Sequence, residues 1–113
     1  MRRVVITGLG IVSCIGNNKE EVLTSLKGQT SGIRYIPEYE EAGFRSHIAG
    51  RPQISPDDHI DRKQRRFMGD SAAYSYIALK EAIADAGLSD DMVSSPRTGL
   101  IAGSGGASSS DIV

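Results

Sequence analysis

Two short apolar segments, each followed at once by glycine, set the strongest limits on the fold of this chain. Residues 3–7 lead into Gly8 and Gly10, and residues 98–102 lead into Gly103. Neither segment alternates polar with apolar side chains, which is typical of strands buried on both faces of a sheet. Glycine makes up 13 of the 113 residues, and it contributes backbone freedom rather than core volume. The pattern predicts two buried strands that end in glycine loops.

Two helices are predicted from capping residues and apolar spacing. Asn18, with Glu21 three residues later, is a helix-start pattern, and Gly28 is expected to end this helix. Its buried face would carry three apolar residues, Val22, Leu23 and Leu26. A longer helix is expected over residues 70–86, with Gly87 after its end. The many alanines of this longer helix favour close packing and burial on more than one side.

The remaining segments carry weaker signals. Residues 33–35 and 46–49 are compatible with short strands, separated by an acidic stretch that is compatible with a turn or a short helix. Ser55 followed by Pro56 predicts a short helix that runs into a basic cluster, and residues 89–92 predict another short turn. The order of strand, glycine loop and helix favours the α/β class with at least a partly parallel sheet.

Charge and cysteine content exclude several classes of protein. The 13 Lys and Arg residues against 14 Asp and Glu residues leave a net charge of -1, which gives no electrostatic case for binding nucleic acid or a membrane surface. The single cysteine excludes an internal disulfide framework and fits a reducing compartment. The apolar run at the N-terminus is too short for a signal peptide or a membrane span. We therefore expect a cytoplasmic protein without a nucleic-acid or membrane partner.

The first glycine loop partly matches a dinucleotide-binding fingerprint. Gly8 and Gly10 follow a predicted strand, but Ser13 occupies the third small position and the helix begins only near Asn18. No acidic residue follows at the distance at which such sites bind the ribose. A tight structural loop is the favoured interpretation, with dinucleotide binding as the alternative.

Cys14, in the same loop, is the one thiol that could act as a nucleophile. A nucleophilic cysteine needs a base nearby, and neither His47 nor His59 has a spacing that points to Cys14. The two histidines also form no metal-ligand pattern with one cysteine. We expect a small, buried structural thiol and no metal site.

A basic cluster is the most informative surface feature. Arg62, Lys63, Arg65 and Arg66 place four positive charges within five residues, and a helix would put Arg62 and Arg66 on one face with Lys63 beside them. Two interpretations stay open on residue chemistry alone. The cluster is either a solvated face compensated by nearby acids, or a docking patch for an acidic partner or a phosphate group. The nearby acids are Asp57, Asp58, Asp61 and Asp70.

Several blocks of the sequence, taken in order, resemble the N-terminal part of the β-ketoacyl-acyl-carrier-protein synthases, the condensing enzymes of fatty acid synthesis. These blocks are residues 4–13 with 15–17, 31–33, 60–63 with 66–68, 82–88 and 103–106. Residues 45–47, 61–63 and 101–106 most resemble the type I elongating synthase, with the type II synthase as the nearest relative to exclude. The resemblance implies a thiolase-like α/β fold of αβαβα layers. Residues 1–113 would form an incomplete N-terminal domain, with no second domain.

The same resemblance implies an activity for the family and the absence of its catalytic residues from this chain. The family elongates acyl chains by decarboxylative condensation of an acyl-enzyme with malonyl-acyl-carrier protein, as a homodimer. Substrates arrive on a phosphopantetheine arm, so no cofactor is expected. The catalytic cysteine and two histidines of the family match no residue of this chain, which we expect to be inactive alone. The alternative from another class is a non-catalytic partner subunit of the chain-length-factor kind.

The resemblance also assigns the basic cluster a partner. Residues at positions matching Arg45, Arg62, Lys63 and Arg66 bind the acidic acyl carrier protein in the type I synthases, and this favours docking over a solvated face. Arg65 has no matching role in the family and is left out of the predicted docking set.

Overall fold

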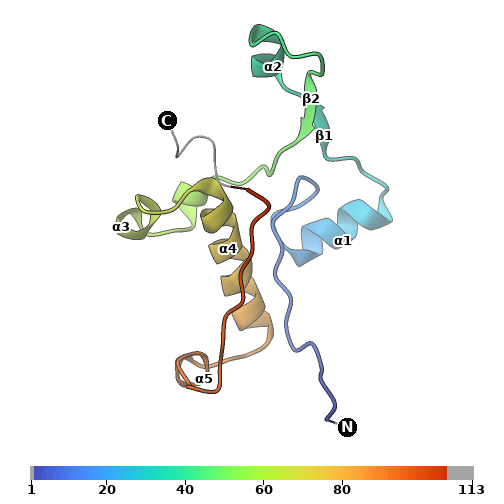
Figure 1. Cartoon of the computed structure of the whole chain (residues 1–113). Coiled ribbons are helices and arrows are strands. Elements are labelled where there is room, and N and C mark those ends of the chain that lie inside the picture. Colours follow the sequence, from blue (N-terminus) through green and yellow to red (C-terminus); the bar gives the residue numbers. More distant parts are fainter. Residues whose placement is uncertain (1, 107–113) are drawn as a thin grey trace. The chain divides into compact units, whose positions relative to one another are not determined.

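The computed structural model describes residues 2–106, which divide into two compact units (Figure 1). One unit consists of residues 11–54. The other combines residues 2–10 with residues 55–106. No helix in these described residues is both long and apolar enough to cross a membrane.

Helix α1 (Lys19–Lys27) opens the unit of residues 11–54 and begins where its capping residues predict. The Asn18 side chain accepts a hydrogen bond from the Glu21 backbone N–H at 2.9 Å, and Gly28 caps the C-terminal end. Val22 is buried as predicted, but Leu23 and Leu26 are 51% and 62% exposed. The prediction is wrong for these two leucines, because no other helix or strand of the described residues packs extensively against α1.

A short antiparallel hairpin completes this unit. Strand β1 (Ile33–Tyr35) pairs with β2 (Ile48–Gly50) in a register that places Ile33 opposite Gly50, and α2 (Pro37–Glu41) lies between them in sequence. The first predicted strand is confirmed, the second is confirmed with its bounds shifted from 46–49 to 48–50, and the acidic stretch, expected as a turn or a short helix, is a helix. The hairpin is the only sheet within residues 2–106, so the prediction of a partly parallel sheet is wrong for this part of the chain.

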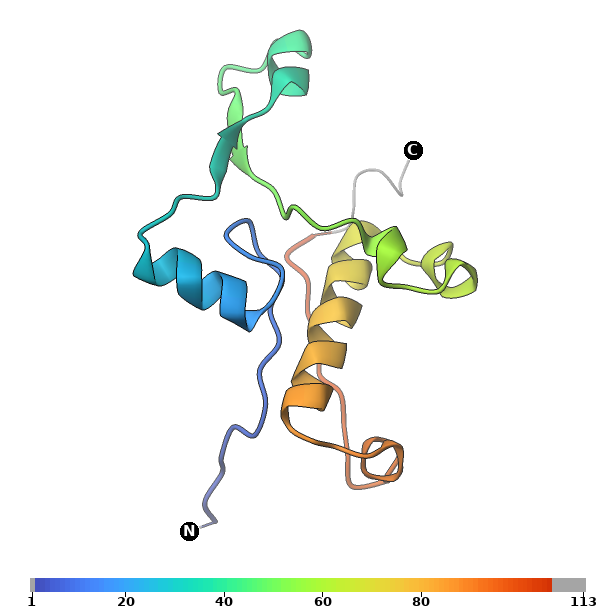
Figure 2. The same cartoon turned by 180° about the vertical axis from the view of Figure 1, so that it is seen from behind.

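Helix α4 (Asp70–Asp85) is the longest element of the other unit and confirms the predicted long helix (Figure 2). Gly87 follows its C-cap with a φ of +65°, a left-handed conformation that favours glycine and ends the helix. Ala73 is fully buried, but the rest of the helix is half-buried or exposed. Burial is therefore less extensive than the alanine-rich sequence predicts.

The N-terminal segment packs its glycines on the alanine stripe of α4. A Cβ atom on Gly8 would lie 2.8 Å from the Cβ of Ala86, and one on Gly10 would lie 2.8 Å from the backbone N of Ala82. The backbone N–H of Leu9 donates to the Asp85 carboxylate at 3.1 Å. The alanines pack closely as predicted, but their neighbour is the glycine backbone of an irregular segment rather than another helix or a sheet.

The two segments predicted as buried strands are not strands in the described residues. Residues 3–7 and 98–102 have no regular structure, and Val4, Ile6 and Ile101 are 90%, 90% and 100% exposed. A strand requires the hydrogen bonds of a neighbouring strand, and neither segment has such a partner within residues 2–106. The prediction failed because an apolar pattern shows only that a segment is suited to be a buried strand. It does not show whether a partner strand is present.

Three short elements flank α4. The helix predicted to begin at Ser55 is a single 3-10 turn, η1 (Pro56–Asp58), and the basic cluster lies on a separate short helix, α3 (Arg62–Arg65). The turn predicted after α4 is α5 (Asp90–Val93). Element η1 contacts both α3 and α4, so it connects the helix that carries the basic cluster to the long helix.

Candidate functional site

The basic cluster sits on α3, whose start is fixed by a side-chain cap. The Asp61 carboxylate accepts a hydrogen bond from the backbone N–H of Lys63 at 2.8 Å. Arg62, Lys63 and Arg66 are exposed, and we call these three residues the α3 basic face. No ion pair within 4.0 Å holds any of the three in the described part of the chain. The face therefore presents three cations to solvent.

Arg66 also contacts an exposed aromatic side chain. Its guanidinium carbon lies 4.5 Å from the ring centroid of Phe67, in cation–π geometry, and Phe67 is 78% exposed. An exposed aromatic ring thus lies beside the cations of the α3 basic face, and aromatic residues and arginine are both enriched at protein interfaces.

Arg65 differs from its three basic neighbours. Its side chain is only 23% exposed and forms ion pairs with Asp57 at 3.0 Å and with Asp70 at 2.8 Å. The solvated-face interpretation, in which nearby acids compensate the cluster, thus holds for Arg65 alone. The sequence analysis named Asp57 and Asp70 among the compensating acids but did not identify Arg65 as their partner, because neither lies three or four positions from residue 65, the spacing that signals contact on one helix.

Arg45, the fourth residue of the predicted docking set, belongs to the other unit. It is exposed and lies between α2 and β2, within residues 11–54. The structure therefore brings together Arg62, Lys63 and Arg66 within one unit and describes Arg45 separately.

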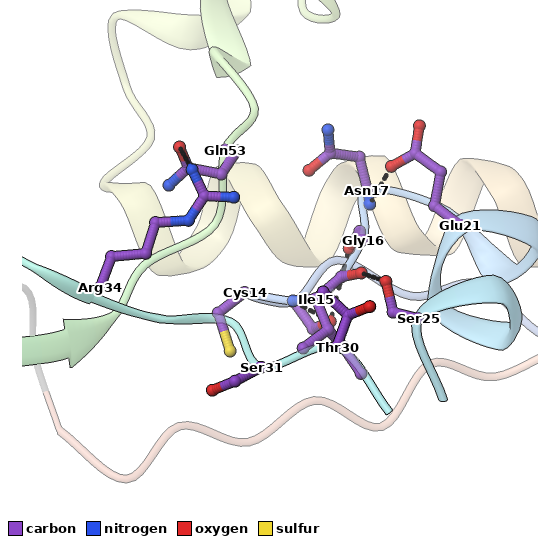
Figure 3. Close-up of a pocket in the computed structure, with 11 residues that line it drawn as sticks. Cys14, Ile15, Gly16, Asn17, Glu21, Ser25, Thr30, Ser31, Arg34 and Gln53 are labelled. Atoms are coloured by element: carbon purple, nitrogen blue, oxygen red, sulfur yellow. Dashed lines mark hydrogen bonds between the residues drawn. The ribbon is translucent and has the colours of Figure 1, made fainter. Parts of the chain in front are cut away.

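A small polar pocket lies in the unit of residues 11–54 (Figure 3). Its volume is about 150 Å³, and Cys14 lines it together with Arg34 and Gln53, whose side chains are hydrogen-bonded at 3.2 Å. The other lining residues are Ser13, Ile15, Gly16, Asn17, Glu21, Ser25, Thr30 and Ser31. No histidine lines the pocket, and its one carboxylate, Glu21, accepts a hydrogen bond from the Asn17 backbone N–H at 2.8 Å.

Cys14 itself is held against the backbone of the hairpin. A Cβ atom on Gly32 or Gly50 would lie 2.7 Å or 2.9 Å from the Cys14 sulfur, which is too close for any larger residue without a shift. The thiol is free and half-buried rather than fully buried. These contacts favour the structural role predicted for Cys14.

The histidines occupy structural positions as well. His47 makes a hydrogen bond through Nε2 to the backbone carbonyl of Phe44 at 2.8 Å, and His59 caps η1. No group of three or more side chains that could hold a metal ion occurs within residues 2–106. The glycine loop also has a structural role. Gly8 and Gly10 face backbone atoms of α4 rather than an open space for phosphate.

Tyr35 of this unit has a shifted pKa. The Tyr35 hydroxyl donates a hydrogen bond to the Glu40 carboxylate, and this bond raises the pKa of Tyr35 above its ordinary value of 10.0, with a smaller contribution from desolvation. The bond joins β1 to α2, so it orders the hairpin rather than supplying an acid or base at a pocket.

Comparison with known proteins identifies the family. Residues 1–113, the whole chain, match the family described as "Beta-ketoacyl synthase, N-terminal domain". The chain belongs to the β-ketoacyl synthase family. This confirms the resemblance carried by the sequence blocks.

The similarity to individual β-ketoacyl synthases is high. The chain is 61% identical over 105 residues to 3-oxoacyl-[acyl-carrier-protein] synthase 1 of Haemophilus influenzae, covering 93% of this chain and 26% of that relative. It is 52% identical over 109 residues to synthase 1 of Escherichia coli K12, covering 96% and 27%. Synthase 2 of Staphylococcus aureus strain COL is 38% identical over 106 residues, covering 92% and 25%. The higher identities to synthase 1 agree with the expected type I resemblance.

A solved β-ketoacyl synthase structure also matches. The enzyme from Burkholderia phymatum STM815 superposes with a TM-score of 0.64 at 34% identity, covering 80% of this chain and 23% of that one. The expected α/β fold class is therefore confirmed as part of a β-ketoacyl synthase fold. The chain spans about a quarter of the length of the curated relatives it matches.

Proposed function

We propose that this chain is the N-terminal part of a type I β-ketoacyl-acyl-carrier-protein synthase, a transferase that elongates acyl chains in fatty acid biosynthesis. The observation that carries the proposal is the 61% identity to a synthase 1 over 93% of the chain. The proposed reaction is decarboxylative condensation of an acyl-enzyme with malonyl-acyl-carrier protein, in the cytoplasm, by a homodimer. Because the acyl groups are delivered on a phosphopantetheine arm, the proposed reaction needs no separate cofactor.

The proposed contribution of these residues is to dock the acyl carrier protein, not to perform the chemistry. Cys14 packs against glycine backbone and has no histidine in its pocket, so it lacks the imidazole base that commonly activates a nucleophilic cysteine. The catalytic cysteine and histidines of the proposed enzyme are expected outside residues 1–113.

Charge and exposure support docking at the α3 basic face. Arg62, Lys63 and Arg66 are exposed and without ion pairs in the described residues, so they keep their full charge for a partner. Unpaired cations of one sign steer an acidic protein toward them and set its orientation. Arg45, which is exposed on the other unit, is proposed as a fourth contact.

The test is a charge reversal in the complete synthase that carries this chain. Changing Lys63→Glu and Arg66→Glu together should weaken binding to acyl carrier protein about tenfold or more at low salt, and the difference should shrink as salt screens the charges. Lys27→Glu with Arg97→Glu makes the same change in net charge at exposed residues outside α3 and is the matched control. Equal affinities for both double variants would remove the proposed docking face.

The condensing activity needs its own measurement. The complete synthase should form a labelled acyl-enzyme and release carbon dioxide from malonyl-acyl-carrier protein. A protein that binds acyl carrier protein but forms no acyl-enzyme would instead be the non-catalytic partner subunit.

A further inference from the structure

We propose that Arg65 is a positioning residue for the α3 basic face, because it binds the two carboxylates that would otherwise pair with the docking cations. The inference rests on the proposed docking function. Arg65 is in the middle of the basic cluster, yet it takes no part in the exposed face.

The Arg65 guanidinium uses all three of its nitrogen atoms. Nε donates to Asp57 at 3.0 Å, Nη2 donates to Asp70 at 2.8 Å, and Nη1 donates to the backbone carbonyl of Met68. Asp57 belongs to η1 and Asp70 begins α4, so one side chain connects both elements to α3. Only the planar fork of arginine can satisfy three acceptors in different directions with fixed geometry.

The two carboxylates would compete for the docking cations if they were released. Asp57 and Asp70 are 74% and 56% exposed and carry charge opposite to that of the basic face. Both flank α3 in sequence and contact it through Arg65, so they lie within one side-chain length of its surface. With Arg65 in place, each carboxylate is already neutralised locally, and the three outer cations stay unpaired.

Neighbouring contacts show that α3 has further attachments besides Arg65. The Tyr76 hydroxyl lies 3.4 Å from the Gln64 side-chain oxygen, and Asp61 caps the helix. The first contact joins α3 to α4 and the second stabilises the start of α3, and neither involves Arg65. Loss of Arg65 should therefore change the charge arrangement more than the placement of the helix.

A purely structural brace is the competing interpretation, and the two make opposite predictions. If Arg65 acts by neutralising the carboxylates, removing those carboxylates together with Arg65 restores docking. If Arg65 acts only by bracing the fold, the same combination leaves docking impaired, since the brace is still missing.

The experiment measures association and dissociation rates with acyl carrier protein at low salt in the complete synthase. Arg65→Gln should slow association about threefold to tenfold with little change in dissociation, as expected for a steering effect. Adding Asp57→Asn and Asp70→Asn to Arg65→Gln should return the association rate to within about twofold of the unchanged protein. No slowing in Arg65→Gln, or no recovery in the triple variant, would overturn the inference.

A second variant keeps the test decisive if Arg65→Gln does not fold. This variant keeps Arg65 and combines Asp57→Asn with Asp70→Asn, which raises the net charge by two. Association should become faster if Arg65 acts by neutralising the carboxylates. If Arg65 acts only as a brace, loss of its two partners should make association slower. Asp90→Asn with Asp91→Asn on α5 is the control of equal charge change. Failure of Lys63→Glu with Arg66→Glu to weaken binding would contradict the docking function itself, so the two failures are distinguishable.

Discussion

Gly10 packs directly on the backbone carbonyl of Ala78, so closely that a methyl group on Gly10 would occupy the space of that oxygen. Because the neighbour is helix backbone, it cannot move aside as a flexible side chain would. The contact joins the N-terminal segment to α4 within one unit.

Gly10→Ala should therefore destabilise the complete synthase by about 1–3 kcal/mol or more, the usual cost of overpacking a tight contact. The measurement is the free energy of unfolding from denaturant titration. Gly99→Ala is the matched control, because nothing lies within 4 Å of a Cβ built there, and it should be neutral or slightly stabilising. Equal stability of the two variants would contradict the packing described for Gly10.

Asn18→Ala should cost about 1 kcal/mol, because it removes the side chain that caps the backbone N–H of Glu21 at the start of α1. Asn18→Asp retains an acceptor at the same position and should keep most of the stability. Denaturant titration of both variants checks the prediction, which fails if alanine and aspartate behave alike.

Glu40→Gln should lower the pKa of Tyr35 toward 10.0, because the hydrogen bond from the tyrosine hydroxyl to the carboxylate raises that pKa. A raised pKa means that the folded state holds the proton more tightly than the unfolded state. This contribution to stability is therefore complete below pH 10 and is lost as the pH rises through the pKa of the folded protein. Tyrosinate absorbance as a function of pH, compared between the two proteins, measures the shift. An unchanged titration curve would count against the bond.

The 113-residue chain alone should unfold without a cooperative transition. Only four apolar residues are buried among those described, Val22, Ile36, Ile60 and Ala73, while the apolar segments 3–7 and 98–102 have exposed side chains and no strand partner. Little buried apolar area leaves little to offset the loss of chain entropy. Circular dichroism during heating tests this, and a single sharp transition would contradict it.

Local signals were sufficient to predict the elements that depend on neighbours in sequence. The cap at Asn18 and the glycine at 87 gave the bounds of α1 and α4 closely, because capping is a contact between residues a few positions apart. The hairpin strands were also found, since their apolar runs are bounded by turn residues.

Sequence patterns could not predict the features that depend on contacts between distant residues. The strands expected at residues 3–7 and 98–102 require a partner strand that no local pattern supplies. In the candidate site, too, local features could be predicted and contacts between distant residues could not. Exposure of Arg62 follows from its position on a short charged helix, whereas the pairing of Arg65 with Asp57 and Asp70 depends on how η1 and α4 meet around it.

The packing of Cys14 has a practical consequence. Gly32 precedes β1 and Gly50 ends β2, so the thiol contacts both strands at the same end of the hairpin. Cys14 is the one cysteine of residues 1–113, and it is half-buried at the edge of a pocket, so a thiol-specific reagent reaches it more easily when the hairpin separates from the loop. The rate at which Cys14 is alkylated in the complete synthase, followed by mass spectrometry of the peptide that contains it, therefore reports local opening of this unit separately from any other cysteine.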